Sequence, residues 1–243
     1  MKTLSLFLIL ITLTSINLKA GHPLRGEDAV SVGKNIWQLE LTSDLFYDKG
    51  RRNFDIPFTA SYGLNDNMDF ITNIPFHHSS DLTNNLGLGD ICLELKWILF
   101  NSKNFSAGIK PSLSFASGDR NKGCGKGKNN FALNFIMTVY NDFSNIHLNA
   151  GYIRNDNYDN ERLNLWFLSA GSELFLSDKI YTMLELGINQ NNSKERAVNP
   201  AYLVCGVGYI VNNKITLDIG YLRGLNNEET DNGFLFGAGF SIR

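Results

Sequence analysis

The sequence predicts an all-β protein, a transmembrane antiparallel up-and-down β-barrel of about twelve strands with both termini periplasmic. Three observations support this fold class. Apolar residues alternate with polar or small ones over long segments, the connections between these segments are alternately short and long, and aromatic residues gather near the segment ends. A period of two indicates a strand with one apolar and one polar face, and a tilted strand needs roughly 9–11 residues to cross a bilayer.

The chain begins with a predicted secretory signal. Lys2 precedes a short apolar run, and the small residue Ala20 ends the segment, as is typical of signal peptides. We predict cleavage near Ala20, a periplasmic N-terminal segment at 21–35 and the barrel at 36–243. After the signal no stretch reaches 18 apolar residues, so the sequence offers no transmembrane helix.

Composition narrows the function classes. The net charge of −2 and pI near 6.1 argue against a nucleic-acid partner, which needs a basic face. Three cysteines without C-x-x-C spacing give neither a disulfide framework nor a zinc site. Cys92 and Cys205 fall within strand patterns, whereas Cys124 falls in a loop, where we expect a free thiol.

Six predicted strands make up the first half of the barrel. Their alternating apolar residues include Trp37, Leu39, Leu41 and Leu45 in 36–47; Phe54, Ile56, Phe58 and Ala60 in 53–64; Phe70, Ile74 and Phe76 in 68–76; Ile91, Leu93, Leu95 and Trp97 in 89–99; Ile109 and Leu113 in 105–115; and Phe131, Leu133 and Phe135 in 131–139.

The second half continues the pattern to the end of the chain. Its alternating apolar residues include Ile146, Leu148 and Ala150 in 146–152; Trp166, Leu168 and Ala170 in 164–174; Leu184, Leu186 and Ile188 in 180–188; Leu203, Val207 and Tyr209 in 203–211; Ile215, Leu217 and Ile219 in 215–222; and Phe234, Phe236, Ala238, Phe240 and Ile242 in 232–243.

The connections indicate a barrel rather than a soluble sandwich. Short turns follow the second, fourth, sixth, eighth and tenth strands, and long polar loops follow the third, fifth, seventh, ninth and eleventh. Bacterial outer-membrane barrels have short periplasmic turns and long extracellular loops. Two predicted aromatic girdles agree with this: Trp37, Tyr62, Trp97, Phe105, Tyr209 and Phe240 at one level, and Tyr47, Phe54, Phe115, Phe131, Tyr152, Tyr221 and Phe234 at the other.

The segment from His22, "HPLRGEDAVSVGKNIWQLEL", resembles the start of the mature chains in an outer-membrane β-barrel family assigned to the meta-pathway of phenol degradation or to transport. Further similarities to this family are the segments "PSLSFASGD", "AGSELFLSD" and "LDIGYLRGL". The resemblance covers nearly the whole mature chain and implies a barrel that passes or binds small organic, also aromatic, molecules. One departure is the end of the last strand. Family members end on an aromatic residue, whereas Ile242-Arg243 ends this chain, which weakens its signal for the barrel assembly machinery.

The phase of the charged residues predicts which strand face lines the lumen, because charge at the lipid face costs a few kcal/mol at the midplane. The candidate lumen or solute-binding residues are Glu40, Asp44, Asp55, Asp69, Asp90, Glu94, Lys96, Lys110, Glu173, Glu185 and Asp218. Glu94, Lys96 and Lys110 lie on neighbouring predicted strands and are expected to pair across the inner wall. Structural ion pairing and solute selection are equally open roles for them.

A predicted extracellular loop carries four basic residues, Arg120, Lys122, Lys126 and Lys128. It is not a phosphate-binding P-loop, because the glycine spacing differs and no Ser or Thr follows the Gly-Lys pairs. A solvated loop, binding of lipopolysaccharide phosphates and a constriction folded into the lumen are the three interpretations.

An enzyme is the less favoured alternative. His78 and Ser80 are two residues apart, as in the His-x-Ser pair on the outer wall of outer-membrane lipases, and Asp81 and Asn84 are nearby. A serine nucleophile needs a histidine within hydrogen-bond reach and a third group to orient it, and no residue is clearly placed for that. His22 and His147 lack metal-ligand spacing, and we expect no cofactor.

These observations predict passive passage or binding of small solutes. Eight strands leave a filled interior and sixteen a water channel, so twelve predict a narrow or partly occluded lumen. The acidic excess favours cations or neutral solutes over anions. A closed structural or binding barrel is the alternative, and the expected partners are outer-membrane lipids, lipopolysaccharide, the assembly machinery and a small solute.

Overall fold

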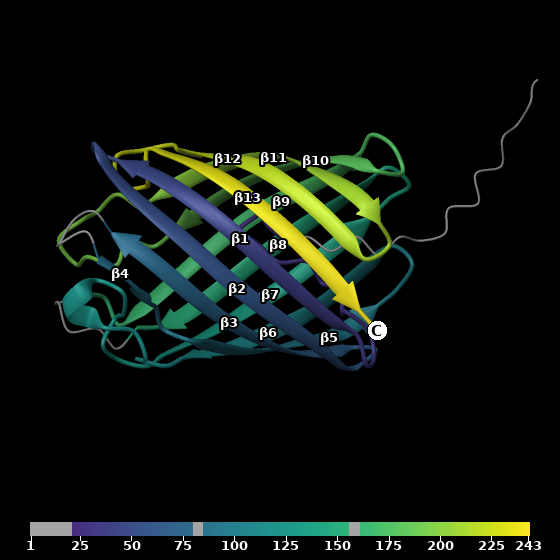
Figure 1. Ribbon diagram of the computed structural model, residues 1–243, viewed down its shortest axis with the longest axis horizontal. Helices are drawn as coiled ribbons and strands as arrows, with labels where there is room; N and C mark the ends of the chain where they lie inside the picture. Colours follow the sequence, from purple (N-terminus) through teal and green to yellow (C-terminus); the bar gives the residue numbers. More distant parts are fainter. Residues whose placement is uncertain (1–20, 80–84, 156–160) are drawn as a thin grey trace, which may run out of the picture.

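The chain folds into a closed antiparallel β-barrel (Figure 1). The computed structural model describes residues 21–79, 85–155 and 161–243. The strands of this part are β1 (Trp37–Asp48), β2 (Arg51–Asn65), β3 (Met68–Ser79), β4 (Asn85–Leu88), β5 (Cys92–Asn101), β6 (Phe105–Ser114), β7 (Asn130–Tyr140), β8 (Ser144–Arg154), β9 (Asn164–Phe175), β10 (Ile180–Asn189), β11 (Ala201–Asn212), β12 (Ile215–Gly224) and β13 (Asn232–Ile242). No helix in the described ranges has the length and apolar character needed to cross a membrane.

Twelve strand positions form the wall, which confirms the predicted count. β1 pairs with β2 on one side and with β13 on the other, so the sheet closes on itself. The short β4 continues β5 rather than adding a position: β4 pairs with the last residues of β3 and β5 with its first ones. Between them, the Gly89 N–H donates to the Pro75 carbonyl at 2.7 Å, which keeps this interrupted strand attached to β3.

The connections follow the predicted alternation. Two to four residues join β2 to β3, β5 to β6, β7 to β8, β9 to β10 and β11 to β12 at one end of the barrel. Longer loops and the β1–β2 turn lie at the other end. We call these the short-turn end and the long-loop end. β1 begins and β13 ends at the short-turn end, because Trp37 pairs with Ile242; that this end faces the periplasm stays a prediction.

The wall is apolar outside and polar inside. In β8, Ile146 and Leu148 are exposed, whereas the alternate residues His147 and Asn149 are 2% and 4% exposed. A water-soluble protein would bury the opposite set. The inverted pattern fits an exterior in hydrocarbon and a lumen that holds the polar groups.

The aromatic girdles are also present. At the short-turn end the rings of Trp37 and Tyr62, paired across β1 and β2, are 4.8 Å apart. At the long-loop end the ring of Phe234 lies 6.2 Å from that of Tyr47 and 5.5 Å from that of Tyr221.

The lumen is not lined only by polar groups. Inward side chains of β10 to β13 form an apolar cluster of Tyr181, Met183, Tyr202, Val204, Ile210, Leu222 and Leu235. Inward tyrosine rings lie against glycines directly across the sheet: Tyr181 against Gly208 and Tyr202 against Gly187. Covering a cross-strand glycine in this way lets a large ring lie flat on the wall.

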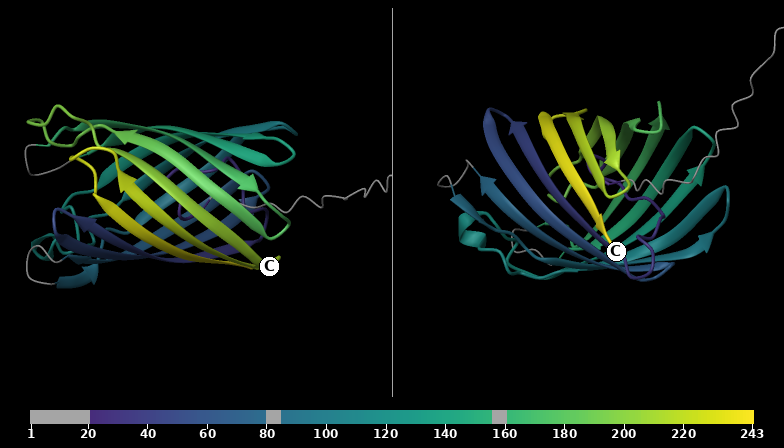
Figure 2. Two further views of the ribbon diagram at one scale, coloured as in Figure 1. Left: turned by 90° about the horizontal axis from the view of Figure 1, so that it is seen from above. Right: turned by 45° about the vertical axis from the view of Figure 1, so that its right-hand side comes forward.

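Residues 21–35, which we call the lumen segment, lie inside the barrel (Figure 2). The sequence predicted a separate periplasmic segment ahead of the barrel, and the structure differs in packing it among the inward side chains of the wall. None of these fifteen residues, all of which are described, belongs to a strand. The physical reason is charge: the inward-facing acids and lysines of the wall need partners, and this polar segment supplies them.

Candidate functional site in the barrel lumen

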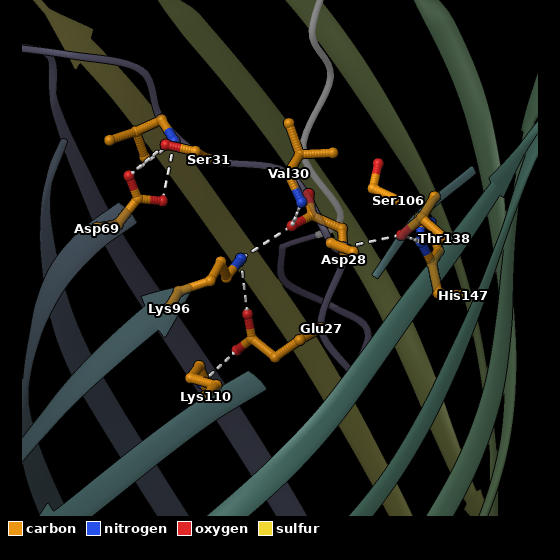
Figure 3. Close-up of polar contacts among 12 residues, drawn as sticks. Glu27, Asp28, Val30, Ser31, Asp69, Lys96, Ser106, Lys110, Thr138 and His147 are labelled. Carbon is orange, nitrogen blue, oxygen red and sulfur yellow. Dashed lines mark hydrogen bonds and ion pairs between the residues drawn. The ribbon is translucent and has the colours of Figure 1, made fainter. Parts of the chain in front are cut away.

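Two wall lysines hold the centre of the lumen segment (Figure 3). Lys96 Nζ on β5 lies 2.8 Å from Asp28 Oδ1 and 3.0 Å from Glu27 Oε2. Lys110 Nζ on β6 lies 2.7 Å from Glu27 Oε1 and 2.8 Å from Glu94 Oε2. Each oxygen of the Glu27 carboxylate therefore binds a different lysine. Glu94 and Lys110 pair as the sequence suggested, whereas Lys96 binds the lumen segment.

Most members of these ion pairs are buried, while the Glu27 side chain is 28% exposed. The side chains of Asp28, Lys96 and Lys110 are 1%, 8% and 11% exposed. Burial alone would raise the pKa of Glu27, but the ammonium groups of Lys110 and Lys96 outweigh it and hold this pKa well below its usual range. Because a buried charge without a partner is costly, removing Lys96 or Lys110 should weaken the docking of the segment.

His22 anchors the start of the segment between two strands. Its Nδ1 lies 2.5 Å from Asp218 Oδ1 on β12, and its Nε2 lies 2.8 Å from Asp44 Oδ1 on β1. Burial lowers the pKa of His22, but the hydrogen bonds to Asp218 and Asp44 outweigh burial and raise it to about 9. The imidazolium therefore neutralises part of the predicted acidic lumen.

Asp69 anchors the other end of the segment, close to β1. Its two carboxylate oxygens accept the Val32 N–H at 3.1 and 2.9 Å, and its Oδ1 accepts the Ser31 hydroxyl at 2.6 Å. The Asp69 side chain, on β3, is thereby committed to the backbone of the lumen segment.

The segment comes close to the long-loop end at Arg25 and Gly26. The Arg25 N–H donates to Glu185 Oε2 at 2.6 Å, its guanidinium lies 4.5 Å from the centre of the Tyr202 ring, and its Nη1 lies 3.3 Å from Glu229 in the β12–β13 loop. Gly26 is packed so tightly that an added Cβ would lie within 2.7 to 2.9 Å of three side-chain atoms on β8, β9 and β10.

Apolar contacts complete the docking. Leu24 joins the apolar cluster of β10 to β13. Pro23 lies on Gly206 and Gly220, which face each other on β11 and β12; a Cβ on either glycine would approach the Pro23 ring to 2.6 or 2.5 Å. The lumen thus has an apolar wall at β10 to β13 and a lysine-bearing wall at β5 and β6, and the segment contacts both.

A hydroxyl, an imidazole and a carboxylate lie in a chain behind the segment. The Ala29 N–H donates to Thr138 Oγ1 at 2.8 Å, this oxygen lies 3.0 Å from His147 Nδ1, and His147 Nε2 lies 3.5 Å from Glu173 Oε2. Thr138 and Glu173 are fully buried. Through the bond from the Ala29 N–H to the buried Thr138 hydroxyl, this group takes part in the docking of the segment.

A cavity of about 570 Å³ lies at the long-loop end, above the segment. Asp55 on β2 and His77 on the neighbouring β3 line it and pair with each other at 2.7 Å. Asp90 lies at its rim and accepts the Gly118 and Lys126 N–H groups at 3.0 and 2.8 Å, which holds the β6–β7 loop. The candidates Asp55 and Asp90 therefore lie outside the docking contacts of the lumen segment.

The remaining candidates are distributed as follows. Glu40 faces the lumen beside Gln38 and Gly21 at the short-turn end. In the basic loop, Arg120, Lys122, Lys126 and Lys128 are exposed, and Lys126 also lines the cavity at the long-loop end. His78 lines the same cavity, whereas Ser80, its proposed partner, lies outside the described residues, as do Asp81 and Asn84.

Sequence reasoning missed the residues that occupy the lumen: His22, Arg25, Glu27 and Asp28. The available signal was an acidic and basic stretch directly after the predicted signal peptide, next to a wall with inward-facing charges. The thiols of Cys92, Cys124 and Cys205 are free, as expected for Cys124. In the described ranges no group of three or more acidic, histidine or cysteine side chains could hold a metal ion.

A family model described as "Putative MetA-pathway of phenol degradation" matches residues 20–243. No curated protein matches the chain. Among solved structures, the COG4313 outer membrane channel from Pseudomonas putida F1 is similar with a TM-score of 0.72 and 13% identity, over 90% of this chain and 100% of that one.

Two further solved structures share the fold. The KdgM porin in complex with disordered oligogalacturonate has a TM-score of 0.63 and 8% identity, over 85% of this chain and 99% of that one. The CymD monoaromatic hydrocarbon channel has a TM-score of 0.52 and 9% identity, over 86% of this chain and 88% of that one. The fold is therefore that of outer-membrane β-barrel channels.

Proposed function

Since the chain belongs to the family described as "Putative MetA-pathway of phenol degradation", we propose that it is an outer-membrane channel for passive passage of small organic solutes. In the state described here, the lumen segment closes it. The family description and the similarity to a channel for monoaromatic hydrocarbons favour aromatic solutes.

The observation that carries this proposal is how the lumen is filled. The segment is held by side-chain and single backbone contacts, not by a strand ladder, and its charged residues pair with wall residues on opposite sides of the barrel. Local regions with few regular backbone hydrogen bonds open more easily than the sheet that surrounds them. The segment is therefore suited to move while the twelve-stranded wall stays intact.

Passage in this proposal needs no energy source, because the solute moves down its own gradient. The long-loop end would face the outside, with Lys126 and the other basic loop residues near lipopolysaccharide phosphates, and the short-turn end the periplasm. A binding barrel that never opens is the second candidate, favoured by the ion pairs that His22, Glu27 and Asp28 of the segment form with the wall. Lipase-type chemistry at His78 has no support from the channel and porin neighbours.

Planar-bilayer recording tests the proposal. Gly26→Leu forces a side chain against Ser169, Glu185 and Asn149 and should displace the segment. Gly171→Ala is the matched control, since a Cβ there meets Leu24 of the segment at an ordinary 3.5 Å. We expect discrete openings that are rare in the unmodified protein and in Gly171→Ala but frequent in Gly26→Leu. Silence in all three proteins, with no solute entry into liposomes, would reject passage.

A further inference from the structure

The way Glu27 is held suggests what else could bind in its place. Its Oε1 lies 2.7 Å from Lys110 Nζ and its Oε2 lies 3.0 Å from Lys96 Nζ. Two buried ammonium groups therefore bind one carboxylate, each at a different oxygen. Both lysines belong to the wall, whereas Glu27 belongs to the lumen segment. Charge-assisted hydrogen bonds of this kind are roughly twice as strong as neutral ones.

The opposite wall carries the complementary chemistry. Pro23 and Leu24 of the segment pack on the apolar cluster of β10 to β13 and on the bare backbone of Gly206 and Gly220. Along one short stretch, the segment thus presents an apolar part to one wall and a carboxylate to the other.

We propose that the lumen is a binding site for amphiphilic carboxylates and that the lumen segment occupies it as an internal ligand, with Glu27 in place of the solute carboxylate and Pro23-Leu24 in place of its apolar body. This proposal rests on the proposed function and specifies its substrate class. It departs from the preference for cations or neutral solutes that the acidic excess suggested, because the carboxylate would meet the two lysines on β5 and β6, whereas Asp44 and Asp218, which bind His22 while the segment is docked, lie on β1 and β12.

The proposal requires that solute and segment compete. A ligand whose site is free only part of the time binds with an affinity reduced by that fraction. Weakening the segment must therefore strengthen solute binding, while neutralising the lysines must abolish it. If the ion pairs had a purely structural role, weakening the segment would not strengthen solute binding, and neutralising the lysines would not abolish it.

The probe is 4-phenylbutyrate, with 4-phenyl-1-butanol as its uncharged counterpart and acetate as a carboxylate without an apolar body. Binding is measured by equilibrium dialysis against the purified mature protein in detergent. Glu27→Gln with Asp28→Asn removes the competing carboxylates, and Gly26→Leu displaces the segment sterically without changing a charge. Lys96→Gln with Lys110→Gln removes the clamp, and Lys103→Gln, in the exposed β5–β6 turn, is the matched lysine control.

We expect both segment variants to bind 4-phenylbutyrate about tenfold more tightly than the unmodified protein, since they free the site, and to prefer it to both other probes. The double lysine variant should lose this binding, and Lys103→Gln should keep it. Retained β-sheet circular dichroism identifies folded variants. The proposal would be overturned if 4-phenylbutyrate and 4-phenyl-1-butanol bound equally well. It would also be overturned if neither folded segment variant bound 4-phenylbutyrate more tightly than the unmodified protein.

The same proteins separate this inference from the proposed function. If 4-phenylbutyrate binds in a lysine-dependent way to a barrel that never conducts, passage is rejected and the binding site is retained. If Gly26→Leu conducts but 4-phenylbutyrate does not bind in a lysine-dependent way, the binding site is rejected and passage is retained.

Discussion

Pro23 lies directly on Gly220, so close that a Cβ at that glycine would come within 2.5 Å of the proline ring. The contact ties the lumen segment to Gly206 and Gly220, which pair with each other on β11 and β12. It also makes the docking of the segment sensitive to a single wall side chain.

Gly220→Val should therefore undock the segment without unfolding the barrel. Ala29, 1% exposed in its packing with Ile98 and Ile136, provides the readout when it is replaced by cysteine in a protein whose native cysteines are serine. A water-soluble thiol reagent should label Ala29→Cys slowly alone and much faster with Gly220→Val. Equal rates would show that Pro23 does not hold the segment.

Lys96→Met should also release the segment. It leaves Asp28, which is fully buried, without its cation, and stranding one member of a buried ion pair costs about 3–5 kcal/mol. Adding Asp28→Leu should restore part of the protection of Ala29→Cys, because the stranded charge is gone. A double-mutant cycle of labelling rates measures the coupling, and additive effects would argue against the pair.

The docking of the segment should weaken at alkaline pH. The pKa of His22 is raised from 6.5 to about 9 by docking. A raised pKa means that the stabilisation is complete below about pH 6.5 and is lost as the pH rises through about 9. Openings in planar bilayers should thus become more frequent, by about tenfold or more, between neutral pH and pH 10. His22→Gln should open more at neutral pH and lose this dependence, and an unchanged pH profile in that variant would assign the effect elsewhere.

Membrane orientation can be tested on intact cells. Cysteine at Lys126, in the β6–β7 loop, should react with an impermeant thiol reagent, whereas cysteine at Lys103, in the β5–β6 turn, should react only after the outer membrane is permeabilised. Both positions are exposed at opposite barrel ends, so access decides the result. The reverse pattern would invert the proposed topology.

Much of the wall could be predicted from the sequence because a strand's two faces alternate at a fixed period. In β13, Phe234, Phe236 and Phe240 are exposed to the outside, as their spacing indicated, while Leu235 turns inward to the apolar cluster. The alternation of short turns and long loops gave the strand order, because consecutive strands of an up-and-down barrel pair with each other.

The sequence by itself thus determined the barrel, its strand count and the inward direction of Glu94, Lys96 and Lys110, since local periodicity encodes all three. Only the tertiary structure decided what these lysines bind. The pairing of Lys96 with Asp28 joins residues 68 positions apart. Pro23 packs on Gly206 of β11 and Gly220 of β12, which are also far from it along the chain. No local pattern encodes such contacts, because they exist only once the sheet has closed around the segment.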